Sequence, residues 1–245
     1  MVLMLKTIAL ASLFLLVPLS TACVSGGGGR GAPAVERGKF FGHDLRNTQD
    51  IVFVLDLSGS MSGQSGTIVE QAGTSIGAKA AGALTGSLLG RRSGRAVRNR
   101  VSDLNKKIEK VKLHLIASLT GLPPGARFNL VLFSGRVQTL SPAMIPANGL
   151  SVAAVSAFVE RLQEGGSTNM FQAMEAAFFQ DATQIVLLTD GLPTSSSPGA
   201  ILDLAQRYNA DRRLTISTVG VGGDQARDFL ATLAQENGGS FSMYF

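Results

Sequence analysis

Residues 51–60, with the sequence IVFVLDLSGS, decide the fold of this 245-residue chain. The apolar run 51–55 is typical of a strand that is buried on both faces of a parallel sheet. Asp56, Ser58 and Ser60 follow at alternate positions, on the loop that leaves the carboxyl end of this strand. Open α/β sheets bind ligands at that end, where three oxygen-bearing side chains can converge on a hard cation.

Two later segments carry matching chemistry. Residues 165–169, GGSTN, form a tight, hydroxyl-bearing loop before a helical pattern, and the apolar run 185–189 is a second buried strand that ends in Asp190-Gly191. Together with D-x-S-x-S, this order resembles the metal-ion-dependent adhesion site of von Willebrand factor type A domains, over residues 46–245. By that resemblance, hydroxyls and carboxylates of five residues hold the metal, the carboxylates directly or through water: Asp56, Ser58, Ser60, Thr168 and Asp190.

The chemistry of these side chains points to the same kind of site. An all-oxygen set suits Mg²⁺, with Mn²⁺ or Ca²⁺ as alternatives, and does not suit zinc or copper, which prefer nitrogen and sulfur. Since only Asp56 and Asp190 are acidic, a bound dication stays under-neutralised and its octahedron incomplete. The resemblance implies that a Glu or Asp of a protein ligand fills the gap. We therefore expect a metal-dependent protein-binding domain and not an enzyme.

Each motif also has a simpler interpretation when it is taken alone. Asp56 can be a helix N-cap, Thr168 and Asn169 another cap, and 189–191 an ordinary turn, because these residue types favour such positions. It is the ordered set of three motifs, each at the end of an expected strand or before a helix, that favours the metal site.

Enzymatic alternatives fit the sequence poorly. A Mg²⁺-dependent phosphatase of the haloacid dehalogenase type also places a nucleophilic Asp after a strand, but Ser58 stands where that family needs its second Asp. The two histidines, His43 and His114, lie in a probable linker and within a helical pattern, with no visible partner for Ser-His-acid chemistry. Residues 220–223, GVGG, lack the third glycine of a dinucleotide-binding fingerprint.

The remaining pattern predicts alternating strands and helices. This alternation indicates an α/β fold with a doubly wound, mostly parallel sheet, flanked by helices on both faces and carrying one short antiparallel edge strand. We expect strands at 51–56, 128–134, 136–140 (the edge strand), 184–189, 214–221 and 240–244. We expect helices at 104–119, 151–163, 170–179, 198–208 and 224–236.

The first 45 residues read as an export and anchoring region. Residues 1–22 have a short basic start, an apolar stretch at 8–19 and small residues at the end, which indicates a signal peptide. Residues 19–23, LSTAC, resemble a bacterial lipobox, so we expect Cys23 to be lipidated; the alternative is a free thiol after an ordinary cleavage. Residues 23–45 then form a flexible linker, and the domain spans 46–245.

This export region implies a location outside the cytoplasm. We expect a membrane-anchored lipoprotein on the periplasmic side or the cell surface. By resemblance, Val24 after the cysteine favours the outer membrane if the cell is Gram-negative.

An insertion at 62–102 departs from the family pattern. It is rich in glycine at four-residue spacing, which suits either close helix contact in a membrane or a flexible surface loop. The run 91–112 has nine basic and two acidic residues, more net charge than the +5 of the whole chain. It can meet anionic lipid, whereas its lysines can also form an ordinary solvated helix face. The export signal and the absence of Trp argue against nucleic acid as a partner.

A second function therefore stays open beside metal-dependent binding. In it, the chain is a membrane-associated structural protein that acts through the glycine-rich and basic insertion.

Overall fold

A computed structural model describes residues 35–63, 106–211, 214–223 and 226–244. Within these residues, the main sheet has seven strands, in the order β5-β4-β3-β7-β8-β9, with β6 beside β4. The strands are β3 (Asp50–Asp56), β4 (Arg127–Phe133), β5 (Val137–Thr139), β6 (Ile145–Pro146), β7 (Gln184–Thr189), β8 (Thr215–Val221) and β9 (Gly238–Tyr244).

The sheet is mostly parallel, as predicted. β3 pairs in parallel with both β4 and β7, and β8 pairs in parallel with β7 and β9. The edge strand β5 runs antiparallel to β4, and so does β6, a second antiparallel strand that the sequence did not predict. In β3, β4 and β8 every residue after the first is buried, as expected for strands that helices cover on both faces of the sheet.

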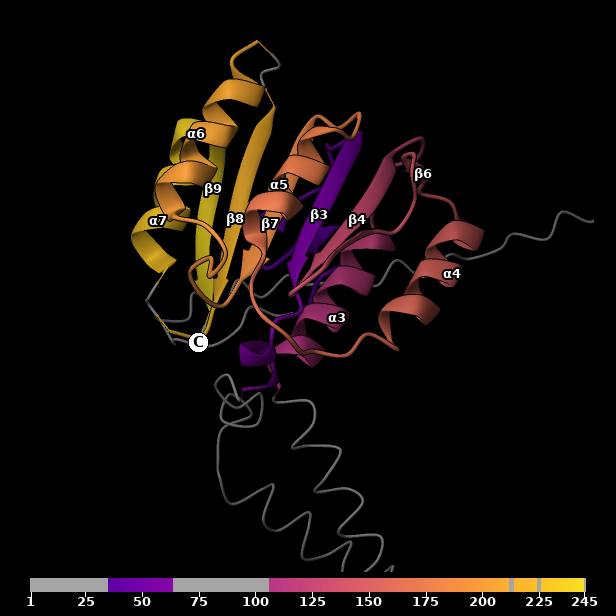
Figure 1. Ribbon diagram of the computed structural model, residues 1–245. Helices are drawn as coiled ribbons and strands as arrows, with labels where there is room; N and C mark the ends of the chain where they lie inside the picture. The colour runs from indigo at the N-terminus through magenta and orange to yellow at the C-terminus, as the bar shows by residue number, and fades with distance from the viewer. Residues whose placement is uncertain (1–34, 64–105, 212–213, 224–225, 245) are drawn as a thin grey trace, which may run out of the picture.

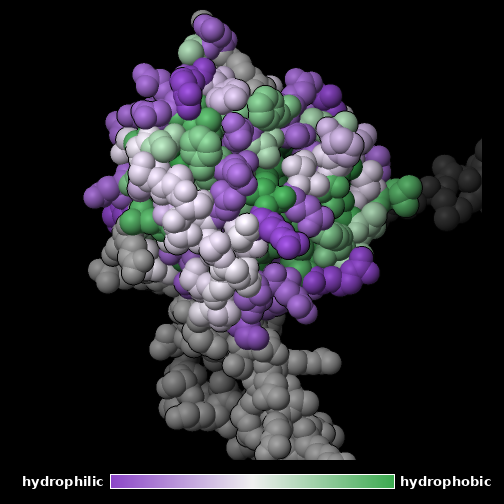
Figure 2. Space-filling view, in the orientation of Figure 1, coloured by the Kyte–Doolittle hydropathy of each residue, from purple (hydrophilic) through white to green (hydrophobic). Residues whose placement is uncertain are grey.

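Helices cover both faces of the sheet (Figure 1), which confirms the doubly wound class. The helices are α3 (Lys107–Leu119), α4 (Gly149–Val159), α5 (Met170–Phe178), α6 (Pro198–Asn209) and α7 (Arg227–Glu236). Apolar residues of α3 and α4 pack on one face, and those of α5, α6 and α7 pack on the other. Figure 2 shows the face with α5 and α6, where hydrophobic and hydrophilic residues are interspersed.

Local sequence explains where two of these helices begin. At α6, the Ser197 hydroxyl accepts a hydrogen bond from the Ala200 amide at 3.2 Å, and Pro198 occupies the first turn. At α4, the cap is Asn148, whose side chain accepts from the Ser151 amide at 2.9 Å. Helix α4 therefore begins two residues earlier than the predicted start at Ser151, and it ends at Val159 instead of 163.

A short hairpin precedes β3 and corrects the predicted linker. Strands β1 (Lys39–Phe40) and β2 (His43–Asp44) pair antiparallel, and Phe40, Phe41 and Leu45 are buried against α3 and the sheet. The prediction of a flexible linker through residue 45 is therefore wrong for 39–45. Two strands of two residues each are too short to show a periodic pattern, so they could not be predicted from hydrophobic periodicity.

Several predictions fall on residues that the structure does not describe. The signal peptide, Cys23 and nearly all of the 62–102 insertion lie outside the described residues. Within the described ranges, every helix is too short or too polar to cross a bilayer.

Candidate metal centre

The predicted motifs meet at the carboxyl edge of the parallel strands, where the tips of β3, β4 and β7 point the same way (Figure 1). In the register of β3 and β7, Leu55 lies opposite Leu188, so Asp56 comes next to Thr189. A short 3₁₀ helix, η1 (Gly59–Ser62), follows β3 directly and carries Ser60 beside the end of β7. Strand pairing therefore brings Asp56 next to Thr189, 133 positions later, and η1 adds Ser60 to the same place.

Asp56 is fully buried and held at both carboxylate oxygens. Oδ1 accepts a hydrogen bond from the Ser58 amide at 2.7 Å, and Oδ2 accepts one from the Thr189 hydroxyl at 2.6 Å. Burial raises the pKa of Asp56, and the hydrogen bonds from Ser58 and Thr189 offset part of that rise. A cation beside this carboxylate would favour its ionised form.

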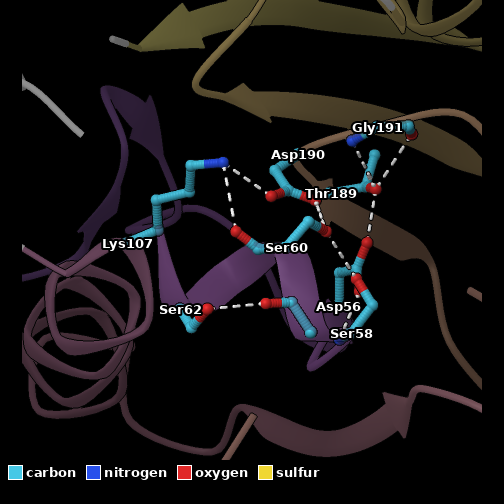
Figure 3. A network of polar contacts seen from close by, with 9 residues as sticks. Asp56, Ser58, Ser60, Ser62, Lys107, Thr189, Asp190 and Gly191 are labelled. Carbon is cyan, nitrogen blue, oxygen red and sulfur yellow. Dashed lines mark hydrogen bonds and ion pairs between the residues drawn. The ribbon is translucent and has the colours of Figure 1, made fainter. Parts of the chain in front are cut away.

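A chain of hydroxyls links this region to the second acid (Figure 3). The Ser58 and Ser60 hydroxyl oxygens lie 3.0 Å apart, and the Ser60 hydroxyl donates to Asp190 Oδ1 at 2.7 Å. Four of the five predicted ligands thus stand in one continuous set of oxygens. We call Asp56, Ser58, Ser60, Thr189 and Asp190 the oxygen cluster.

Lys107, the first residue of α3, reaches into the oxygen cluster. Its ammonium lies 2.6 Å from Asp190 Oδ2 and 3.3 Å from the Ser60 carbonyl oxygen (Figure 3). The Lys107 side chain is 13% exposed and that of Asp190 is 2% exposed, so this is a largely buried ion pair. The interpretation of the basic-run lysines as a solvated helix face is wrong here, and also for Lys110 and Lys112, which are buried.

Thr168, the fifth predicted ligand, lies on the neighbouring loop. This loop is joined to the β3 side by hydrogen bonds from Gly59 N to Gly166 O at 3.1 Å and from Gly165 N to Leu57 O at 2.7 Å. Thr168 is buried, whereas Ser167 is exposed. Of these two adjacent hydroxyl-bearing residues, the predicted ligand Thr168 is thus the buried one. Its hydroxyl takes no part in the hydrogen bonds described for the oxygen cluster.

The loop holds this position through backbone contacts with the segment after β7. The Thr168 amide donates to the Thr194 hydroxyl at 3.0 Å, and the Thr194 amide donates to the Thr168 carbonyl at 3.1 Å. Asn169 is the N-cap residue of α5 but makes no capping hydrogen bond with its side chain, which donates to Gln172 at 2.7 Å instead. The simpler interpretation of this motif as a helix cap is therefore right about the position of Asn169, but its side chain makes no capping hydrogen bond.

The donor set fits a hard dication. Among the described residues there is no group of three His, Cys, Asp or Glu side chains that could hold a metal, so zinc-type or acid-rich sites have no candidate there. The oxygen cluster instead combines two carboxylates with hydroxyls, the ligand types that Mg²⁺, Mn²⁺ and Ca²⁺ accept. A cation already lies at Asp190, because the Lys107 ammonium contacts it.

Sequence reasoning missed two members of this region. Thr189 orients Asp56, and its only signal was its place before Asp190 at the end of an apolar run. Lys107 was visible only as one of nine basic residues, because a charge pattern cannot tell which lysine of a helix start points inward.

Comparisons with known proteins bear on the family and the fold. The family model described as von Willebrand factor type A domain matches residues 49–72 and 100–243. The chain is 26% identical over 206 residues to inter-alpha-trypsin inhibitor heavy chain H1 of Mesocricetus auratus, and 32% identical over 149 residues to heavy chain H4 of Homo sapiens. These matches cover 78% and 55% of this chain but only 18% and 16% of those relatives.

A solved structure shares the fold at low sequence identity. A von Willebrand factor type A protein from Catenulispora acidiphila matches with a TM-score of 0.57 and 20% identity, over 81% of this chain and 39% of that chain.

Proposed function

The chain belongs to the von Willebrand factor type A family, and we propose that its domain binds a partner protein through a divalent cation. Domains of this family typically mediate protein interactions and are generally not enzymes. In the proposal, Mg²⁺, or alternatively Mn²⁺ or Ca²⁺, is held by Asp56, Ser58, Ser60, Thr168 and Asp190. The bound cation supplies a positive centre for an acidic residue of the partner.

One observation carries the proposal. Asp56 and Asp190 come from the ends of different strands, yet Ser58, whose amide donates to Asp56, and Ser60, whose hydroxyl donates to Asp190, join them through contacting hydroxyls. Two buried carboxylates that share a site repel each other unless a cation stands between or beside them. The single charge of Lys107 neutralises only one of the two, so the cluster keeps an affinity for further positive charge.

A metal titration tests the proposal. Calorimetry should detect Mn²⁺ and Mg²⁺ binding by the purified protein, and a metal concentration about 100 times the Kd should add about 2.7 kcal/mol to its stability. The variants Asp56→Asn and Asp190→Asn should lose both effects. The matched control is Asp203→Asn, the same charge change at an exposed position of α6, which should bind like wild type. Equal binding by Asp56→Asn and wild type would overturn the proposed site.

The location of the domain is a second part of the proposal. The signal peptide and the acylated Cys23 would place the domain outside the cytoplasm, where it can meet a partner protein while attached to a membrane. A Cys23→Ser variant should move from the membrane fraction to the soluble fraction of the same compartment. Unchanged membrane attachment of this variant would contradict lipid anchoring at this residue.

A further inference from the structure

Lys107 is placed differently from an ordinary surface lysine. Its ammonium contacts Asp190 Oδ2 at 2.6 Å and the Ser60 carbonyl at 3.3 Å, two groups of the oxygen cluster itself. Its backbone amide also donates to the Gly63 carbonyl at 3.2 Å, which fixes the start of α3 beside η1. Both its main chain and its side chain are therefore tied to the segment that follows β3.

The space that the Lys107 side chain fills is kept open by a glycine. Gly222 follows β8 and has a φ of +103°, a conformation that side chains with a Cβ rarely adopt. A Cβ at this position would lie 2.9 Å from both Cε and Nζ of Lys107. The end of β8 thus leaves room for an ammonium beside Asp190, and a larger residue would displace it.

The Asp190 carboxylate would have to bind both the Lys107 ammonium and the proposed divalent cation. Asp190 is one of only two acidic groups in the oxygen cluster, and one of its oxygens is already paired with Lys107. A divalent cation on Asp190 would repel the ammonium at this distance, since both are positive and both are shielded from water. Lys107 is the more exposed partner and sits at the end of a flexible four-carbon stem, so it is the group that can move.

We propose that Lys107 is a resident counter-cation that closes the site without metal and must leave Asp190 when a divalent cation binds, so that it sets the metal affinity. This inference rests on the proposed function, and it names a residue that competes with the metal instead of ligating it. The site then exchanges one positive group for another, and the domain is stable in both states.

Calorimetry with Mn²⁺ gives the first test. The variant Lys107→Met removes the competing charge and keeps the apolar stem, so its Kd for Mn²⁺ should fall about tenfold or more relative to wild type. In a chelator, the same variant should melt below wild type because Asp190 loses its partner. The matched control is Lys112→Met on the same helix: Lys112 pairs with Glu109 at 2.8 Å, away from the oxygen cluster, and its loss should leave the Mn²⁺ affinity unchanged.

Amine labelling of the wild-type protein gives the second test and does not depend on a variant. Acetylation by a water-soluble reagent, followed by mass spectrometry, should modify Lys107 slowly in a chelator and several times faster with saturating Mn²⁺. The rate at Lys112 should be the same in both conditions. A Lys107 rate that Mn²⁺ leaves unchanged would show that the ammonium stays in place.

The outcomes separate this inference from the proposed function. If wild type and Lys107→Met bind Mn²⁺ equally and labelling does not change, the counter-cation inference is wrong and the metal site stands. If only Lys107→Met binds, the inference holds in its strongest form, because Lys107 then blocks the site. If neither binds, the proposed metal site fails and this inference fails with it.

Discussion

Helix α3 buries several polar side chains, and the regions around two of them, Lys107 at its first residue and His114 in its middle, differ in kind. At the start, Lys107 is charged and pairs with Asp190 in a cluster that holds a second carboxylate. Two turns later, His114 is stacked on Phe41 at 4.1 Å between ring centres, and burial lowers its pKa to about 4, so it is neutral at pH 7. Lys107 thus keeps a charge that can be exchanged, whereas the His114 ring carries none at pH 7.

The region around His114 includes the hairpin β1–β2 and the part of β9 beside it, and we call it the hairpin side. Hydrogen bonds join this hairpin to β9. The two ring nitrogens of His43 lie 2.8 Å and 2.7 Å from the hydroxyls of Ser240 and Ser242. Burial lowers the pKa of His43, so this imidazole also tends to stay neutral. The two imidazoles of this region favour the neutral form and are stacked or hydrogen-bonded, which suits a permanent contact, whereas an ion pair beside a second carboxylate, Asp56, suits binding. The comparison predicts that changes at the hairpin alter stability and that changes at the site alter metal affinity.

The largest expected effect is on the hairpin side. Phe40 is fully buried, with edge-to-face contacts to Phe41 and Phe53 at 5.1 and 5.2 Å, so Phe40→Ala should lower the free energy of unfolding by about 3–5 kcal/mol. Urea unfolding measures this loss. Phe179→Ala, at a side chain that is 70% exposed, should change stability by less than about 1 kcal/mol. The Mn²⁺ affinity of the folded fraction should be the same in both variants.

Acid should weaken the hairpin side next. The folded-state pKa of His114, about 4, lies below its ordinary value of 6.5, so the unfolded chain takes up the proton first. Its contribution is therefore complete above pH 6.5 and is lost as the pH falls towards 4, reaching a loss of about 2 kcal/mol at pH 5. The difference in unfolding free energy between wild type and His114→Gln isolates this effect from that of the site acids. A pH-independent difference would show that His114 is not buried as a neutral group.

A smaller effect is expected at the site side. Thr189→Val removes the hydroxyl that donates to Asp56, so it should cost about 1–2 kcal/mol of stability and weaken Mn²⁺ binding. The matched control is Thr183→Val, just before the start of the same strand, where the hydroxyl donates to the Asp50 backbone carbonyl. Both variants lose a hydroxyl, but only the first should change the Mn²⁺ affinity in calorimetry. The same affinity in both would remove Thr189 from the site.

The smallest effect on stability is expected from the insertion. The described residues on either side of 64–105 are already joined, because the Lys107 amide donates to the Gly63 carbonyl at 3.2 Å. Replacing residues 64–100 with a short Gly-Ser loop should therefore change the unfolding free energy by about 1 kcal/mol at most, with the metal-dependent rise in melting temperature kept. Binding to anionic vesicles at low salt should weaken if the basic run contributes. An unfolded variant would show that the insertion belongs to the core.

The sheet and most helices could be predicted because their signals are local. Strands β3 and β7 are apolar runs that end in polar residues, and the predicted bounds of β7 match the structure. The fold class followed from the alternation of such runs. The hairpin could not be predicted, since Phe40 and Phe41 are buried by contacts with α3 and β9, which are distant in the sequence.

The candidate site was predictable only in part. The order of motifs was enough to bring Asp56, Ser58, Ser60 and Asp190 together, because parallel strands end at one edge. The role of Thr168 as a ligand stays a prediction. The contact of Lys107 with Asp190 could not be predicted from the sequence. The direction of the Lys107 side chain depends on the room that Gly222 leaves and on where α3 begins after the insertion.

The hairpin also affects which contacts break first when the chain is pulled from its N-terminal side. A load that enters the chain ahead of residue 39, as it would in a protein tethered at Cys23, reaches the contacts of His43 with β9 and of Gly38 with α3 before it reaches β3. If those contacts peel away, residues 38–50 extend to about 40 Å, while the sheet and the candidate site stay intact. In a protein attached at Cys23, the hairpin would thus add extensible chain between the attachment point and the sheet.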